Sequence, residues 1–199
     1  MIIWLNGAFG AGKTTVAYEL HRRLENSFVY DPENVGYFLR KNMPEECHTH
    51  DFQDMKLWRS FNFQILKEIH EAYGGTVIVP MTLVNPQYDG ELIRRLLDEG
   101  VPVVHCVLYA SRETILRRLK KRSLGRLDKE AFAVEAIDRC LDFFDHHASA
   151  VRIETDDLTV DEVVLQIGKE CGLNLPPDKG GKIPQEAARL KTAIQHIRK

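Results

Sequence analysis

The stretch of residues 7–14 constrains this chain more than any other feature. It reads Gly-Ala-Phe-Gly-Ala-Gly-Lys-Thr and matches the GxxxxGK[ST] pattern at all of its fixed positions. A short apolar run, residues 2–5, precedes it, and residues 13–24 follow with apolar positions at helical spacing. This strand-loop-helix context predicts a loop whose backbone N–H groups point at a bound phosphate.

Each position of this loop has a predicted role in holding a nucleoside triphosphate. Lys13 reaches the outer phosphates, Thr14 offers its hydroxyl to Mg²⁺, and Thr15 lies near the α-phosphate. We therefore predict ATP and Mg²⁺ as cofactors. The alternative is a glycine-rich turn that binds nothing, and the complete match in the right context argues against it. The predicted nucleotide-binding residues are Gly7, Ala8, Phe9, Gly10, Ala11, Gly12, Lys13, Thr14, Thr15 and Arg118.

Apolar runs alternate with helical patterns along the chain, which favours an α/β fold with a parallel sheet. We predict a three-layer P-loop fold of the nucleoside and shikimate kinase type, with five strands in the order 2-3-1-4-5. The 199 residues fit one domain over residues 1–172, followed by a linker and a basic amphipathic helix over 173–199. The expected strands are 2–5, 28–30, 76–79, 103–109 and 151–154, and the expected helices include 13–24, 52–73, 91–98 and 113–122.

Charge and composition exclude several classes of protein. The formal net charge is −2, so the whole molecule does not attract nucleic acid, and we predict no nucleic-acid partner. No uncharged apolar run reaches the ~18 residues that span a bilayer. The four cysteines form no CxxC pair, and the first residues lack a charged leader, which predicts a cytoplasmic protein with reduced thiols.

A basic segment follows the fourth expected strand. Arg118 and Arg122 are four residues apart, on one face of the helix expected over 113–122, and Arg126 follows a turn. Cations placed this way suit a lid that closes over ATP and neutralises the moving phosphoryl group. The segment 117–139 resembles the lid of the adenylate, shikimate and gluconate kinase group. The alternative is a solvated basic helix face.

The acceptor side of the site is predicted from residues that follow the second and third strands. Asp31 is a candidate general base or acceptor-positioning carboxylate, or alternatively a helix cap before Pro32. The third strand leads to Val79-Pro-Met-Thr and lacks an obvious metal-binding aspartate at its end. On the long middle helix, Trp58 and Phe61 either face the acceptor or belong to the core. The predicted substrate-binding residues are Asp31, Arg40, Arg59, Met81, Thr82 and Asn85.

Several spaced motifs that together cover nearly the whole chain resemble the ATP-binding tunicamycin resistance proteins. The resemblance implies a bacterial cytoplasmic protein that protects against tunicamycin, a uracil nucleoside that carries sugars and a fatty acyl chain. The motifs are residues 1–24, Val29-Tyr-Asp-Pro-Glu, Asp51-Phe-Gln, Leu57-Trp-Arg-Ser-Phe-Asn, Val77-Ile-Val-Pro-Met-Thr, Ile137-Asp-Arg-Cys, Thr155-Asp-Asp-Leu and the basic C-terminal arm.

These observations predict a small-molecule kinase that transfers the γ-phosphate of ATP to a hydroxyl of such a nucleoside. Its predicted catalytic residues are Lys13, Asp31, Arg118 and Arg122, with Thr14 as the metal ligand. One alternative is an ATP-gated protein that sequesters the drug at a membrane, and another is a kinase for an unrelated metabolite. The helix expected over 184–199 either binds an anionic membrane surface or packs on the domain.

Overall fold

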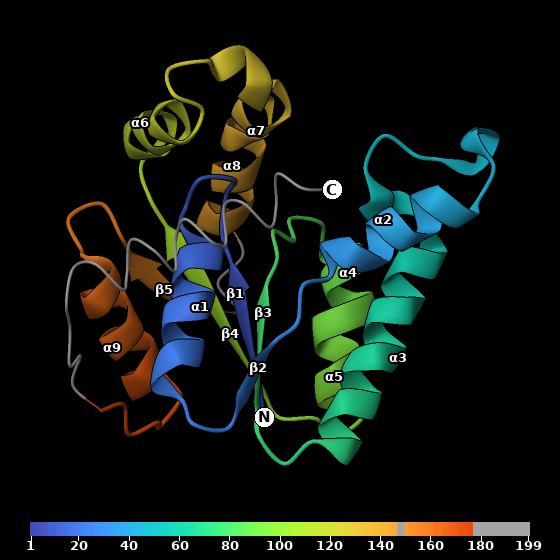
Figure 1. The fold of residues 1–199 in the computed structure, drawn as a ribbon, viewed down its shortest axis with the longest axis vertical. Helices are drawn as coiled ribbons and strands as arrows, with labels where there is room; N and C mark the ends of the chain where they lie inside the picture. The colour runs from blue at the N-terminus through green and yellow to red at the C-terminus, as the bar shows by residue number, and fades with distance from the viewer. Residues whose placement is uncertain (147–149, 177–199) are drawn as a thin grey trace.

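The computed structural model describes residues 1–146 and 150–176 (Figure 1). The helix expected over 184–199 therefore lies outside the described residues, as does most of the linker before it. Both stay predictions. Among the described helices, none is long and apolar enough to span a membrane.

The sheet has five parallel strands in the order β2-β3-β1-β4-β5, which confirms the predicted order. β1 lies at its centre, where it pairs with β3 on one side and with β4 on the other. All five strands therefore present their carboxyl ends at one edge, where open α/β sheets bind ligands. The strands are β1 (Ile2–Asn6), β2 (Ser27–Val29), β3 (Thr76–Pro80), β4 (Val103–Tyr109) and β5 (Val151–Glu154).

Helices cover both faces of the sheet, so the strands are apolar on both sides. Alternate residues of β1 enter different cores: Ile2 and Trp4 belong to one buried cluster, and Ile3 and Leu5 belong to the other. The first core lies under α2 (Glu33–Asn42), α3 (Lys56–Ala72) and α5 (Arg95–Asp98), and the second lies under α1 (Lys13–Arg23) and α9 (Val160–Glu170). Figure 1 shows these two groups of helices on opposite sides of the strands.

A third group of helices lies beyond the carboxyl edge of the sheet, within the segment predicted to be a lid (Figure 1). These helices share a separate buried cluster that includes Ala8 of the phosphate loop and Val107 of β4. The cluster places this segment directly over the loop. Its elements are α6 (Arg112–Arg122), the short turn η4 (Leu127–Glu130), α7 (Ala131–Glu135) and α8 (Ile137–His146).

Two helices begin at positions that differ from the sequence prediction, and a capping side chain explains each difference. The expected helix 52–73 begins only at Lys56, because Asp51 accepts a hydrogen bond from Gln53 N and starts the separate turn η2 (Phe52–Asp54). The expected helix 91–98 begins earlier, as α4 (Pro86–Asp89), because Asn85 accepts from Gln87 N and Tyr88 N. It continues through the π-helical turn η3 (Gly90–Arg94) into α5.

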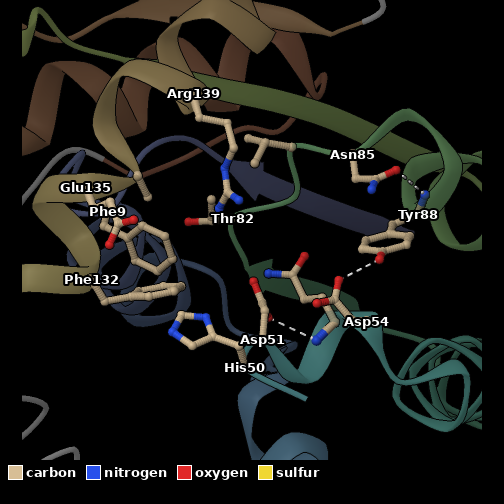
Figure 2. Close-up of a pocket in the computed structure, with 13 residues that line it drawn as sticks. Phe9, His50, Asp51, Asp54, Thr82, Asn85, Tyr88, Phe132, Glu135 and Arg139 are labelled. Carbon is tan, nitrogen blue, oxygen red and sulfur yellow. Dashed lines mark hydrogen bonds between the residues drawn. The ribbon is translucent and has the colours of Figure 1, made fainter.

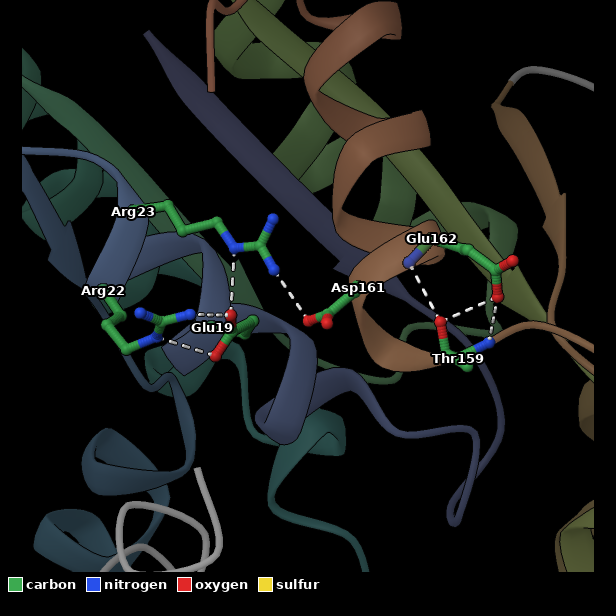
Figure 3. A network of polar contacts seen from close by, with 6 residues as sticks. All are labelled: Glu19, Arg22, Arg23, Thr159, Asp161 and Glu162. Atoms are coloured by element: carbon green, nitrogen blue, oxygen red, sulfur yellow. Dashed lines mark hydrogen bonds and ion pairs between the residues drawn. The ribbon is translucent and has the colours of Figure 1, made fainter. Parts of the chain in front are cut away.

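An ion-pair network joins α1 to α9 (Figure 3). Arg23, whose side chain is 2% exposed, donates to Glu19 at 2.9 Å and to Asp161 at 2.7 Å. Glu19 also pairs with Arg22. Although burial acts to raise the pKa of Glu19, the hydrogen bonds from Arg22 and Arg23 outweigh it and hold that pKa below its ordinary value. Every charge in this buried contact has a partner.

Candidate active site

The phosphate loop connects β1 to α1, and its glycines have backbone conformations that other residues adopt only with strain. Gly12 has φ 100°, immediately before α1. Gly7 has φ 144°, and a Cβ there would approach Leu108 O to 2.6 Å. The first turn of α1 contains no acidic side chain, so its positive end remains available to an anion. The loop therefore fits a bound phosphate chain.

Lys13 folds back over this loop. Its Nζ donates to Gly7 O at 2.9 Å and to Ala8 O at 3.0 Å. Burial lowers the pKa of Lys13 to about 8, while the nearby charge of Glu33 acts in the opposite direction. Nearby Glu33 belongs to the first turn of α2, so the turn after β2 lies close to the ammonium group. Within the described residues this half-buried ammonium donates to carbonyl groups alone, so it is ready to bind anionic ligands.

Asn6, the last residue of β1, ties the phosphate loop to the segment after β3. Its Oδ1 accepts from Gly7 N and from Leu83 N, both at 2.8 Å, and its Nδ2 donates to Leu83 O at 2.8 Å. Thr82 adds a second link, because its hydroxyl donates to Gly7 O at 2.9 Å. The loop that holds phosphate and the segment 81–85 therefore form one hydrogen-bonded unit.

The structure separates the two arginines that the sequence places on one helix face. Arg118 is half-buried and donates to the hydroxyl and the carbonyl group of Thr155 and to Ala11 O. It thus joins α6 to the phosphate loop and to the segment after β5. Arg122 instead pairs with Glu130 at the surface and carries a 57% exposed side chain. Arg126 pairs with Asp128, also at the surface.

A cavity of about 390 Å³ lies beside the phosphate loop (Figure 2). Phe9 and Thr82, which belong to or contact the loop, form part of its wall. The rest of the wall comes from the segment before α3, from the β3–α4 connection and from α7 and α8. The cavity is therefore open both to the phosphate loop and to the predicted lid. Its other lining residues are His50, Asp51, Gln53, Asp54, Val84, Asn85, Tyr88, Phe132, Glu135, Ala136 and Arg139.

Aromatic contacts connect the walls of this cavity. The ring of Phe9 meets that of Phe132 edge-on at 5.4 Å, and Phe132 lies 5.6 Å from the ring of His50. Lys13 Nζ lies 5.6 Å from the centre of the Phe9 ring. Phosphate loop, α7 and the segment before α3 thus meet at one small cluster of rings.

Two predicted acceptor-side residues hold the backbone in position. Asp31 Oδ1 accepts from Glu33 N at 3.0 Å, which is the capping role considered from the sequence, and Asp31 does not line the cavity. Arg40 donates to the carbonyl groups of Thr49 and His50 and lies against the ring of Phe52. Arg40 therefore fixes the segment that carries cavity residues and is not itself part of the cavity wall.

Arg59 also lies behind the wall and does not face the cavity. It is 3% exposed, donates to Gln53 O, pairs with Glu91 and stacks on the ring of Tyr88 at 4.3 Å. Direct substrate contact by Arg59 stays a prediction, and in this structure its guanidinium faces these partners and is not part of the cavity wall. Its partners Gln53 and Tyr88 do line the cavity, so Arg59 positions them.

The other predicted acceptor residues divide between cavity and core. Thr82 and Asn85 line the cavity as predicted. Met81 is buried in the core under α3, and it is not part of the wall. Trp58 is a core residue whose indole N–H donates to Pro32 O, and Phe61 lies partly exposed on α3 outside the cavity.

Sequence reasoning assigned no role to several cavity residues from the segments 50–54 and 132–139. Two signals pointed to these segments, because Asp51-Phe-Gln and Ile137-Asp-Arg-Cys are motifs of the family resemblance. Figure 2 shows Arg139 extending from α8 into the cavity, above Asp51 and Asp54. Within the described residues, neither Arg139 nor Glu135 forms a hydrogen bond or an ion pair. Their charges are available to a ligand.

Comparison with known proteins agrees with this geometry. A family model described as an AAA domain matches residues 2–147. The solved structure of the tunicamycin resistance protein of Deinococcus radiodurans is 30% identical, with a TM-score of 0.74 over 88% of this chain and 98% of that chain. The sequence of adenylyl-sulfate kinase from Staphylococcus haemolyticus is 24% identical over an alignment of 179 residues, and the match covers 84% of this chain and 81% of that protein.

More distant structures share the fold. The APS kinase of Mycobacterium tuberculosis, solved in complex with AMPPNP and APS, has a TM-score of 0.60 at 17% identity, over 86% of this chain and 96% of that chain. Similarity at this level supports the architecture and not the substrate. The predicted P-loop kinase fold is confirmed.

Proposed function

This chain belongs to the AAA domain family and to the tunicamycin resistance proteins, and from that premise we propose that it is an ATP-dependent kinase acting on a tunicamycin-like nucleoside. The observation that carries the proposal is the cavity beside the phosphate loop, because it gives a second substrate a place next to Lys13. A nucleotide switch or an ATP-driven machine does not require such a cavity.

In the proposed reaction, the oxygen of an acceptor hydroxyl attacks the γ-phosphorus of ATP. A new O–P bond forms, the bond between the γ-phosphorus and the β–γ bridging oxygen breaks, and ADP leaves. Lys13 and the amides of the phosphate loop neutralise the charge of the moving phosphoryl group. Asp31 lies outside the cavity wall but in the turn that brings Glu33 close to Lys13, and it is the proposed acceptor of the hydroxyl proton.

Magnesium fits this site through Thr14, which offers a hydroxyl in the first turn of α1, next to the phosphate loop. Thr14 would hold Mg²⁺, which would offset the negative charge of the phosphates. β3 ends in Val79 and Pro80 and supplies no carboxylate there. Arg118, through its contacts with Ala11 O and Thr155, would hold the nucleotide side of the site, and residues 117–139 would close over it.

Mass spectrometry of tunicamycin incubated with the protein and Mg-ATP tests the proposal. We expect the drug to gain one phosphate. Unchanged drug together with tight binding would contradict the kinase and favour sequestration. If the protein phosphorylated a different metabolite and left tunicamycin unchanged, it would be a kinase for another substrate.

Two variants divide the assigned roles. Lys13→Ala should abolish nucleotide binding and turnover together. Asp31→Asn should reduce turnover by roughly 10²–10⁴-fold while nucleotide binding remains, because only proton transfer is lost. Thermal unfolding of both variants serves as the folding control. Normal turnover by Asp31→Asn would show that its carboxylate only caps α2.

A further inference from the structure

The cavity wall carries more acidic than basic side chains. Asp51, Asp54 and Glu135 line it, against a single arginine, Arg139, and no lysine, within the described residues. Figure 2 shows Asp51 and Asp54 on one wall, with Arg139 entering from the opposite side. Lys13 lies beyond Phe9, at the phosphate loop, where the triphosphate of ATP would engage it. The acceptor cavity is therefore acidic even though its neighbouring nucleotide site attracts anions.

The acidic side chains still have acceptor capacity after their internal contacts. Asp51 Oδ1 accepts from Gln53 N at 3.0 Å, and Asp54 Oδ1 accepts from Tyr88 OH at 2.6 Å. Each carboxylate has a second oxygen, and a carboxylate accepts up to about four hydrogen bonds. Glu135 has no hydrogen bond in the described part of the chain. A ligand rich in O–H or N–H groups would satisfy these oxygens.

Arg139 offsets at most one of the three carboxylate charges. It enters from α8, and Thr82, which shares the cavity wall with it, is hydrogen-bonded to the phosphate loop. An acceptor bearing phosphate, sulfate or carboxylate would therefore bring its own negative charge into a cavity whose wall already carries an excess of negative charge.

Resting on the proposed function, we propose that the acceptor is an uncharged or cationic molecule, rich in hydroxyl groups and carrying a flat ring, and that the cavity rejects anionic acceptors. The rings of Phe132, His50 and Tyr88 supply the apolar surface for the flat ring. Asp51, Asp54 and Glu135 accept from its hydroxyl groups. This specificity would separate the chain from kinases of anionic nucleotides such as adenylyl sulfate, although the fold is shared.

Calorimetry with the full chain saturated with AMPPNP and Mg²⁺ tests the proposal, because the nucleotide site is then occupied. The neutral probes are tunicamycin and uridine, and the anionic probes are uridine monophosphate and adenylyl sulfate. We expect at least one neutral probe to bind and both anions to bind at least tenfold more weakly. Raising the salt concentration should narrow this ratio, since screening weakens repulsion.

A double variant, Asp54→Asn with Glu135→Gln, should raise the affinity for the anionic probes tenfold or more and so narrow the ratio between the neutral-probe and anionic-probe affinities. Asp138→Asn is the matched control, because Asp138 lies on α8 with a 74% exposed side chain, pairs with Arg112 and does not line the cavity. It should leave the ratio unchanged.

Three results would overturn the proposal: an anionic probe that binds as tightly as the neutral ones, an unchanged ratio in the double variant, or no binding by any probe. The last would mean that the cavity is not an acceptor site. Failure of the proposed function has a different signature, namely neutral probes that bind preferentially while tunicamycin gains no phosphate. The two failures are therefore distinguishable.

Discussion

Glu19 and Arg23 on α1 have the same spacing as Glu135 and Arg139 at the cavity, yet the two pairs behave differently. Glu19 and Arg23 are bonded at 2.9 Å and buried between α1 and α9. Among the residues that the structure describes, Glu135 and Arg139 form no ion pair, and both line the cavity. One pair joins two layers of the fold, while the other leaves both charges to a ligand.

The helix geometry explains the difference. Residues four apart are neighbours only on a continuous helix. Glu19 and Arg23 both lie within α1, whereas α7 ends at Glu135 and α8 begins at Ile137, so Glu135 and Arg139 belong to different helices. Opposite charges at helical spacing therefore indicate an ion pair only where the helix is unbroken.

Removing Arg23 tests the structural half of this comparison and has the largest expected effect. Arg23→Ala leaves the buried carboxylate of Glu19 with Arg22 alone and should lower the free energy of unfolding by about 3 kcal/mol. Urea denaturation measures this loss. Arg22→Ala is the matched control on the exposed side and should cost less than about 1 kcal/mol. Equal effects would show that burial of Arg23 adds nothing.

Removing Arg139 tests the functional half. Arg139→Ala should lower turnover about 10²-fold, equivalent to about 2.7 kcal/mol, because the cavity would lose the one arginine, among the described residues of its wall, that could stabilise the proposed phosphoryl transfer. Its free energy of unfolding should change by less than about 0.5 kcal/mol, since Arg139 forms no hydrogen bond or ion pair with the part of the chain that the structure describes. Arg112→Ala, which removes an exposed pair with Asp138, should leave turnover unchanged. If Arg139→Ala lost stability but not turnover, Arg139 would stabilise the fold as Arg23 does and would not act on the substrate.

The pH dependence of ATP binding tests a third charge, that of Lys13, which has no ion-pair partner among the described residues and would bind a ligand. The pKa of Lys13 is about 8 without nucleotide, and bound phosphates would raise it. Binding above pH 8 must therefore take up a proton, so the affinity for ATP should be level below pH 8 and fall up to about tenfold per pH unit above it. Calorimetry in buffers of different ionisation enthalpy measures this proton uptake. An affinity that stays constant to pH 10 would contradict the lowered pKa.

The smallest effect concerns the start of α9, next to the ion-pair network. Thr159 accepts from Glu162 N, and Glu162 accepts from Thr159 N, which is a reciprocal capping box (Figure 3). Thr159→Ala should cost about 1 kcal/mol of unfolding free energy, with turnover unchanged. Thr159→Asn should restore most of that stability. If turnover fell with Thr159→Ala, the contact between α1 and α9 would contribute to activity as well as to stability.

The fold was predictable because its signals are local and repeated. A complete phosphate loop after an apolar run, and alternation of strands and helices, were sufficient for the strand order. The cavity was less predictable, since its walls come from segments far apart in the sequence. Arg59 illustrates the difficulty, because a charged residue on a long helix gives no sign that Gln53, Glu91 and Tyr88 surround it.

In the predicted lid, too, the partners of the charged residues could not be predicted from the sequence. Arg118 and Arg122 share a helix face, yet each has its own partners, Thr155 and Glu130. The sequence around residues 124–134 has no clear helical period, because it forms the short elements η4 and α7. Phe132 and Glu135 were therefore missed, although they complete the cavity wall.

Asn6 has a thermodynamic consequence for the two substrates. It holds Gly7 and Leu83 through one amide group, so a shift of the phosphate loop reaches the segment that carries Thr82 and Asn85. For the two proposed substrates such coupling must be reciprocal: the factor by which ATP changes the affinity for the acceptor is the factor by which the acceptor changes the affinity for ATP. Where that factor exceeds one, the ATP of a cell would prepare the protein to bind its acceptor.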